Sequence, residues 1–133
     1  MTTHRFELQV YYEDTDFSGV VYHANYLRFF ERAREHVLGP AELVRLWQED
    51  QIGFVVYKAQ LTYREGAMFG DTIEVHSDAV LDSEYRTTFT QKALRKRDQK
   101  LLVEGQIEMV CVDKNRRLVP LPLPVRSRLT ATH

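Results

Sequence analysis

The fold is decided by one stretch near the N-terminus, Ala24-Asn-Tyr-Leu-Arg-Phe-Phe-Glu-Arg-Ala-Arg-Glu-His-Val-Leu38. Apolar side chains recur along it at the spacing of a single helix face, and charged side chains occupy the opposite side. The apolar positions are Tyr26, Phe29, Phe30, Ala33 and Val37. The pattern predicts an amphipathic helix from about Ala24 to Leu38, with Asn25 as its cap and Gly39-Pro40 as its end.

Strand patterns flank this helix on both sides. Upstream, residues 6–12 alternate apolar and polar side chains, and a second short helix is expected to open at Pro40. Downstream, turn residues separate four strand candidates, at about 53–64, 71–81, 85–95 and 101–113. One early helix followed by antiparallel strands indicates an α+β fold, with a curved antiparallel sheet wrapped around the helix. Prolines at every second position predict that the tail from Leu118 runs extended over the surface.

Composition narrows the possible functions. The 133 residues fit a single domain, 1–133, and the formal charge of −1 argues against a nucleic-acid partner. No apolar run is long enough to span a membrane, and no secretory signal precedes the first strand, so a soluble, cytoplasmic protein is expected. The lone Cys111 excludes an intrachain disulfide and sits among apolar neighbours, which predicts a buried thiol.

The loop before the helix carries the residues best suited to chemistry. Three acids, Glu13, Asp14 and Asp16, fall within four positions, and His23 lies at the helix entrance. A carboxylate, an imidazole and a helix N-terminus together supply a base or nucleophile, an orienting group and an oxyanion donor. The plainer alternatives are that the acids only cap the helix and that His23 is structural. The spacing of these acids and His23 fits no metal-ligand pattern, so no metal site is predicted.

A family resemblance bears on this loop. Residues 9–34 closely resemble the 4-hydroxybenzoyl-CoA thioesterase family, and within it the Tol–Pal-associated acyl-CoA thioesterase subgroup (the YbgC type). The short pattern that carries the resemblance is Thr15-Asp16-x-x-Gly19-Val20-Val21-x-His23-x-Asn25. Phe54-Val-Val56, the Gly70-Asp71 turn and Val110-Cys-Val-Asp113 also match, so the resemblance covers nearly the whole chain. It implies the hotdog fold, a long helix wrapped by a five- to six-stranded antiparallel sheet, assembled as a homodimer or homotetramer.

The resemblance also implies a function, the hydrolysis of a fatty or aryl acyl-CoA to the free acid and coenzyme A without a cofactor. Asp16 matches the family's catalytic carboxylate, which attacks the thioester carbonyl or activates the water that does. His23 matches the position whose backbone N–H polarises that carbonyl, although part of the wider family has tyrosine there. Tyr12, Asp14, Gly19 and Asn25 match supporting positions that shape the loop, and Tyr12, Gly19 and Asn25 are expected to bind the substrate.

Two further sets of residues are candidates for substrate binding. Coenzyme A carries phosphates, and the densest cationic cluster is Arg95-Lys-Arg97 at a hairpin turn, although such turns are often charged simply because they are solvated. The aromatic residues of the long helix, Tyr26 first among them, are expected to line an acyl channel or to be plain core.

Two other functions compete with hydrolysis. One is a hotdog hydratase or dehydratase acting on an acyl thioester, but the chain lacks the Gly-Asp-x-Asn-Pro-x-x-His motif of the hydratases. The other is a non-catalytic module that binds acyl thioesters or belongs to the cell envelope, in which the acidic loop only caps the helix. A link to the Tol–Pal system or to acyl carrier protein rests on the resemblance alone.

Overall fold

The computed structural model describes residues 3–130. Its strands are β1 (His4–Gln9), β2 (Gly53–Tyr63), β3 (Thr72–Leu81), β4 (Arg86–Arg95), β5 (Lys100–Val112) and β6 (Leu118–Val119). Its helices are α1 (Asn25–Leu38), α2 (Pro40–Arg45) and α3 (Leu123–Thr130), with a 3-10 turn η1 (Tyr12–Asp14) and a π-helical turn η2 (Leu46–Asp50). The predicted helix, the four downstream strands and the short helix opening at Pro40 are all present, with ends that differ by one or two residues.

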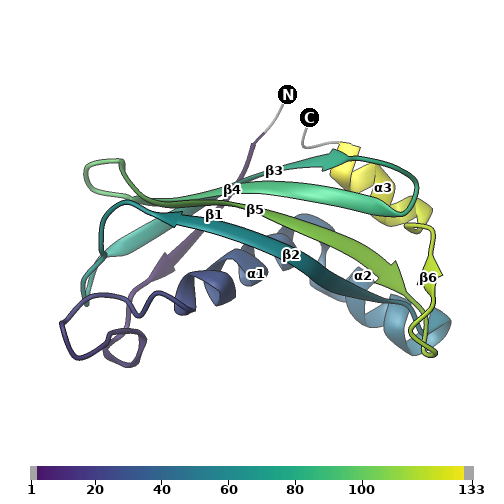
Figure 1. Ribbon diagram of the computed structural model, residues 1–133, viewed down its shortest axis with the longest axis horizontal. Helices are drawn as coiled ribbons and strands as arrows, with labels where there is room; N and C mark the ends of the chain where they lie inside the picture. Colours follow the sequence, from purple (N-terminus) through teal and green to yellow (C-terminus); the bar gives the residue numbers. More distant parts are fainter. Residues whose placement is uncertain (1–2, 131–133) are drawn as a thin grey trace.

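The sheet forms an arch, and α1 lies along its concave side (Figure 1). The strand order is β1-β3-β4-β5-β2, with β6 paired to the end of β5, and every pairing is antiparallel. The expected α+β architecture, a long helix wrapped by a curved antiparallel sheet, is therefore confirmed. In Figure 1 the loop before α1 and the helix α2 lie at opposite ends of the arch.

The aromatic face of α1 supplies the centre of the core. Tyr26, Phe29 and Phe30 are at most 2% exposed, and they face inward-pointing strand residues such as Ile73, Val75 and Phe89, which are fully buried. Burial of one such side chain stabilises a fold by about 1.5–3 kcal/mol. Cys111 is also buried, as expected, and burial raises the pKa of its thiol to about 12.

A buried polar network also joins α1 to the sheet. Gln91 of β4 donates through Nε2 to the carbonyl of Phe30, at 3.0 Å, and to Oγ of Ser77, at 2.9 Å. Its Oε1 accepts a hydrogen bond of 3.0 Å from Nη1 of Arg34. Because a buried amide is costly unless its polar atoms are paired, this network constrains where α1 lies along the strands.

Two expectations about the ends of elements are wrong. Asn25 is not the cap of α1 but its first residue, and Ala24 occupies the cap position without a side-chain hydrogen bond. The tail is not extended throughout, because residues 123–130 form α3 and bury Leu121, Val125 and Leu129. The prolines permit this, since two of them precede α3 and the third lies in its first turn, where a missing N–H is not needed.

A substitution at Gly105 tests how closely β5 packs against β2. A Cβ at Gly105 would lie 2.7 Å from the carbonyl oxygen of Gln60, whereas a Cβ at Gly53 of β2 would meet nothing closer than 3.8 Å. We expect Gly105→Ala to lower the free energy of unfolding by about 1–2 kcal/mol, because the strands must separate to admit the methyl group. Gly53→Ala is the matched control and should leave it nearly unchanged. Urea denaturation measures both, and equal midpoints for the two variants would contradict this packing.

Candidate active site

The loop between β1 and α1 is held mainly through the backbone of Asp14. The carbonyl of Asp14 accepts from the N–H of Tyr22 and from Nδ2 of Asn25, each at 2.9 Å. Its carboxylate accepts from the N–H of Tyr11 at 2.8 Å, which closes the turn η1. Asp14 and Asn25 therefore tie the start of the loop to the start of α1, and the carboxylate of Asp14 is used for structure.

Asp16 lies at the tip of a tight turn within this loop. Its N–H donates to the carbonyl of Val20 at 2.8 Å, and its own carbonyl accepts from the N–H of Gly19 at 3.0 Å. Gly19 has φ +89°, which L side chains rarely adopt, so glycine suits this turn. The carboxylate is exposed, and one oxygen accepts from Oγ of Ser18 at 2.6 Å and from its N–H at 2.8 Å.

These hydrogen bonds set the charge state of Asp16. The hydroxyl of Ser18 lowers the pKa of the Asp16 carboxyl most; desolvation opposes it, but backbone N–H groups of the turn lower it further and the net shift is downward. Hydrogen bonds to the ionised form favour that form. Asp16 is therefore a carboxylate at neutral pH, and its second oxygen has no hydrogen bond within the described residues.

Asp16 opens onto a cavity of about 320 Å³ at the N-terminal end of α1. The residues that line the cavity are Asp16, Val20, Val21, His23, Tyr26, Tyr63, Arg64, Glu65 and Gly66. His23 is exposed, and its ring lies between those of Tyr22 and Tyr63, at 4.6 and 5.9 Å between centroids. Within residues 3–130 the backbone N–H groups of His23 and Ala24 have no acceptor, so they are free to bind an oxygen at the mouth of the helix.

The structure brings only some of the predicted residues together. Asp16, His23 and Tyr26 share the cavity, whereas Gly19 and Asn25 support the loop from outside its lining. Tyr12 lies in η1, with its ring 5.9 Å from that of Phe69. The two predicted arginines also lie outside the lining, at the β4–β5 turn. Arg95 is nearly buried between Glu65 and Asp98, and Arg97 is exposed and lies 3.8 Å from Asp71.

The far wall of the cavity was not foreseen from the sequence. Residues 64–71 run beside the Asp16 loop, where the N–H of Val21 donates to the carbonyl of Ala67 at 2.9 Å and Val20 pairs with Met68. Gly66 has no room for a Cβ, which would lie 2.9 Å from Val20. The hydroxyl of Tyr63 donates to the carbonyl of His23 at 3.1 Å. These contacts join positions some forty residues apart, and no local pattern reveals them.

A second, apolar groove of about 380 Å³ lies at the other end of α1, between that helix, η2 and the start of β2. Its apolar lining residues include Leu38, Leu43, Trp47, Ile52 and Phe54. Arg34 also lines it, is 6% exposed, and has no acceptor for its Nε in the described part of the chain. Arg34 falls four residues after Phe30, on the buried stripe of α1, and that spacing is the signal by which the sequence could have indicated it.

The arrangement around Asp16 suits attack on a carbonyl carbon. An ionised carboxylate can act as base or nucleophile, and free N–H groups at the start of α1 can stabilise the oxyanion that forms. Among residues 3–130 no three histidine, cysteine or acidic side chains are grouped to hold a metal ion. Nor does any helix in that range have the length and apolar character needed to cross a membrane.

Comparison with protein families assigns residues 10–129 to the thioesterase-like superfamily. The chain is 35% identical over 124 residues to the acyl-CoA thioester hydrolase YbgC of Escherichia coli, covering 92% of this chain and 91% of the relative. It is 33% identical over 130 residues to the acyl-CoA thioesterase YbgC of Haemophilus influenzae, covering 96% and 93%.

Solved structures of thioesterases also have a fold similar to that of this chain. A 1,4-dihydroxy-2-naphthoyl-CoA thioesterase from Synechocystis superposes with a TM-score of 0.89 at 26% identity, covering 96% of each chain. A probable thioesterase from Bartonella henselae gives 0.84 at 28% identity, covering 91% of this chain and 100% of the other. The hotdog fold expected from the resemblance is thereby confirmed.

Ser18 provides a test of the electrostatics of this site. We expect Ser18→Ala to raise the pKa of Asp16, because the hydroxyl that donates to the carboxylate is lost. At a mildly acidic pH a larger fraction of Asp16 is then protonated than in the wild type. Titration of the Asp16 carboxyl carbon by NMR measures the change. Thr15→Val is the control, since the hydroxyl of Thr15 donates to the carbonyl of Tyr12 instead, and a similar rise in that variant would contradict the assignment.

Proposed function

Because this chain belongs to the thioesterase-like superfamily, we propose that it hydrolyses fatty or aryl acyl-CoA esters with Asp16 as the catalytic carboxylate. It is an acyl-CoA thioesterase of the YbgC type. The observation that carries the role of Asp16 is its position, ionised and with one unengaged oxygen, on the cavity beside the free N–H groups of α1. Asp14, another acid of the same loop, already accepts a hydrogen bond from the backbone N–H of Tyr11.

Two routes are open to this carboxylate. In the first, Asp16 takes a proton from water while the water oxygen attacks the thioester carbon. In the second, the carboxylate attacks the carbon itself, and water then hydrolyses the mixed anhydride. In both, the N–H of His23 holds the oxyanion, and its collapse expels the thiolate of coenzyme A, which then takes up a proton. One well-placed oxyanion donor contributes about 3 kcal/mol to the stability of such a transition state.

We further propose that the enzyme acts as a homodimer joined through β2. Among residues 3–130 this strand pairs with β5 alone, so its outer edge presents backbone groups without a strand partner there over 11 residues, with Val55, Val56 and Tyr57 exposed. An antiparallel pair of β2 strands continues the sheet across two copies. It also brings the start of one β2 beside the end of the other, so that the apolar groove of one copy adjoins the Asp16 cavity of its partner.

The groove is then the natural place for the acyl group. Its lining is largely aliphatic and aromatic, which fits a fatty or aryl chain, and its volume of about 380 Å³ is that of a small-ligand site. The predicted association with the Tol–Pal system, a link to acyl carrier protein and a cytoplasmic location stay predictions.

Asp16→Asn tests the catalytic role. The substitution is nearly isosteric and removes the charge, so we expect the fold to be retained and turnover to fall by about 100-fold or more. The assay measures free thiol released from a panel of saturated acyl-CoA esters, from short to long, and benzoyl-CoA. A dehydratase or a binding module would release no thiol from any of them.

Asp14→Asn is the matched control, because an amide oxygen can still accept from the N–H of Tyr11. It should retain most of the activity. Near-wild-type hydrolysis by Asp16→Asn would falsify the catalytic assignment.

The proposed homodimer is tested by its mass and by the effect of dilution on activity. Light scattering after size-exclusion chromatography should give about twice the 15.7 kDa mass of the chain, and activity per chain should fall on dilution as the dimer dissociates. A monomer with full activity would show that the site is complete within one copy.

A further inference from the structure

A second carboxylate, that of Glu65, lines the same cavity as Asp16. Nothing in the proposed reaction uses it. A negative charge at that position opposes the reaction in two ways, because it disfavours the ionised form of Asp16 and repels the oxyanion that forms on the substrate. The cavity therefore needs something that cancels the charge of Glu65.

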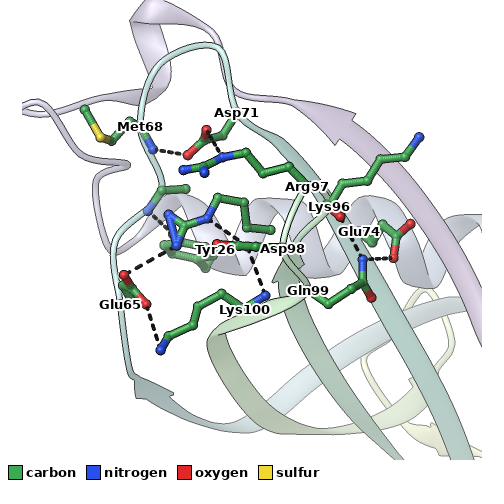
Figure 2. Close-up of polar contacts among 12 residues, drawn as sticks. Tyr26, Glu65, Met68, Asp71, Glu74, Lys96, Arg97, Asp98, Gln99 and Lys100 are labelled. Carbon is green, nitrogen blue, oxygen red and sulfur yellow. Dashed lines mark hydrogen bonds and ion pairs between the residues drawn. The ribbon is translucent and has the colours of Figure 1, made fainter.

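Arg95 supplies that charge from the end of β4. Its Nη2 lies 3.4 Å from Oε1 of Glu65, and its Nε donates to Oδ1 of Asp98 at 3.2 Å. The side chain of Lys100 lies 3.7 Å from the other oxygen of Glu65 but is mostly exposed. In Figure 2 Glu65 and Lys100 face each other beside Tyr26, with Asp98 close by.

We propose that Arg95 is a positioning residue of thioester hydrolysis, which neutralises Glu65 in the cavity and thereby keeps Asp16 ionised and the oxyanion site free of negative charge. The inference rests on the proposed role of Asp16. It assigns to Arg95 a task other than the binding of coenzyme A phosphates that the sequence suggested.

The burial of Arg95 supports this task. The residue is only 7% exposed, and two of its three guanidinium nitrogens face acids of this chain, so little of it is left for a phosphate. Burial lowers the pKa of Arg95, but the nearby acids Asp98, Glu65 and Asp71 together outweigh it and the net shift is upward. The paired cation is therefore a fixed part of the fold.

The remaining charges near Glu65 do not replace Arg95. The titratable or charged groups around Glu65 are Tyr26 of α1, Asp16 and His23 of the loop, Tyr63, Arg64, Asp71, Arg95, Asp98 and Lys100. Arg64 also lines the cavity but pairs with Glu104 of β5 at 3.2 Å, and the side chains of Arg64 and Lys100 are 55% and 60% exposed. Solvent screens such exposed pairs, so their effect on the cavity is small.

Arg95→Met removes the charge and keeps the length of the side chain. With the acyl-CoA ester that the wild type hydrolyses fastest, we expect kcat to fall by about fivefold while KM changes less than twofold. The acid limb of the pH profile of kcat/KM should move up by about half a pH unit, because a Glu65 carboxylate that lacks its buried partner Arg95 raises the pKa of Asp16. A purely structural role would lower the thermal midpoint without moving that limb.

The decisive control is Arg95→Met in a protein that lacks the carboxylate of Glu65. In Glu65→Gln, the further substitution Arg95→Met should lower kcat less than twofold, because the cavity no longer holds the Glu65 carboxylate that Arg95 neutralises. Lys100→Met is the matched cation control and should lower kcat less than twofold. Arg95→Lys keeps the charge and should restore the acid limb to its wild-type position. If Arg95→Met does not fold, Arg95→Gln replaces it, since an amide can still hydrogen-bond Asp98.

Three results would overturn the proposal. A tenfold rise in KM with kcat unchanged would mean that Arg95 contacts coenzyme A, and an equal loss of kcat in the Glu65→Gln background would mean that it acts without Glu65. Asp16→Asn is measured in the same assay. Full activity of that variant would remove the proposed function itself, whereas unchanged kinetics of Arg95→Met beside an inactive Asp16→Asn would count against this inference alone.

Discussion

The burial of the aromatic face of α1 against the concave side of the sheet is the constraint on which the rest of the molecule depends. Tyr26, Phe29 and Phe30 leave no freedom for the helix to rotate, and the hydrogen bonds of Gln91 limit its sliding along the strands. The N-terminal end of α1 is consequently fixed at one end of the arch, where the Asp16 loop meets residues 64–71 (Figure 1). The position of the cavity is thus a result of core packing.

Within the loop, structural and chemical tasks fall to different acids. The carboxylate of Asp14 accepts a hydrogen bond from the N–H of Tyr11, and its carbonyl accepts from the side chain of Asn25 and the N–H of Tyr22. Asp14 therefore holds the loop in shape. Asp16 is bound on one oxygen by Ser18, and its other oxygen is the one that acts on the substrate in the proposed reaction. A preorganised carboxylate of this kind needs no rearrangement before it reacts, which is the usual source of catalytic advantage in such sites.

The sequence predicted what depends on local periodicity, and little beyond it. The stripe from Tyr26 to Val37 and the alternation in the later strands were enough for α1, the sheet and the arch, and the loop motif with its family resemblance pointed to Asp16 and His23. The α3 helix was missed because alternating prolines are typical of an extended chain. Its burial also depends on contacts with β3 and α1, which are distant in the sequence. The pairing of Glu65 with Arg95 was also missed, since it is a tertiary contact across tens of residues. The inward position of Arg34 was missed although its place on the buried stripe of α1 was a local signal, and its partner Gln91 is distant in the sequence.

The open edge of β2 also affects how the chain folds and assembles. A newly folded single chain exposes a long, valine- and tyrosine-bearing strand edge, which is a template for adding strands from other unfolded or misfolded chains. Lys58, with its side chain half exposed near the middle of that strand, is the one basic residue of β2 that discourages such pairing. The proposed dimer would cover this edge, so the yield from heterologous expression should depend on whether two folded chains pair before the edge recruits an unfolded one.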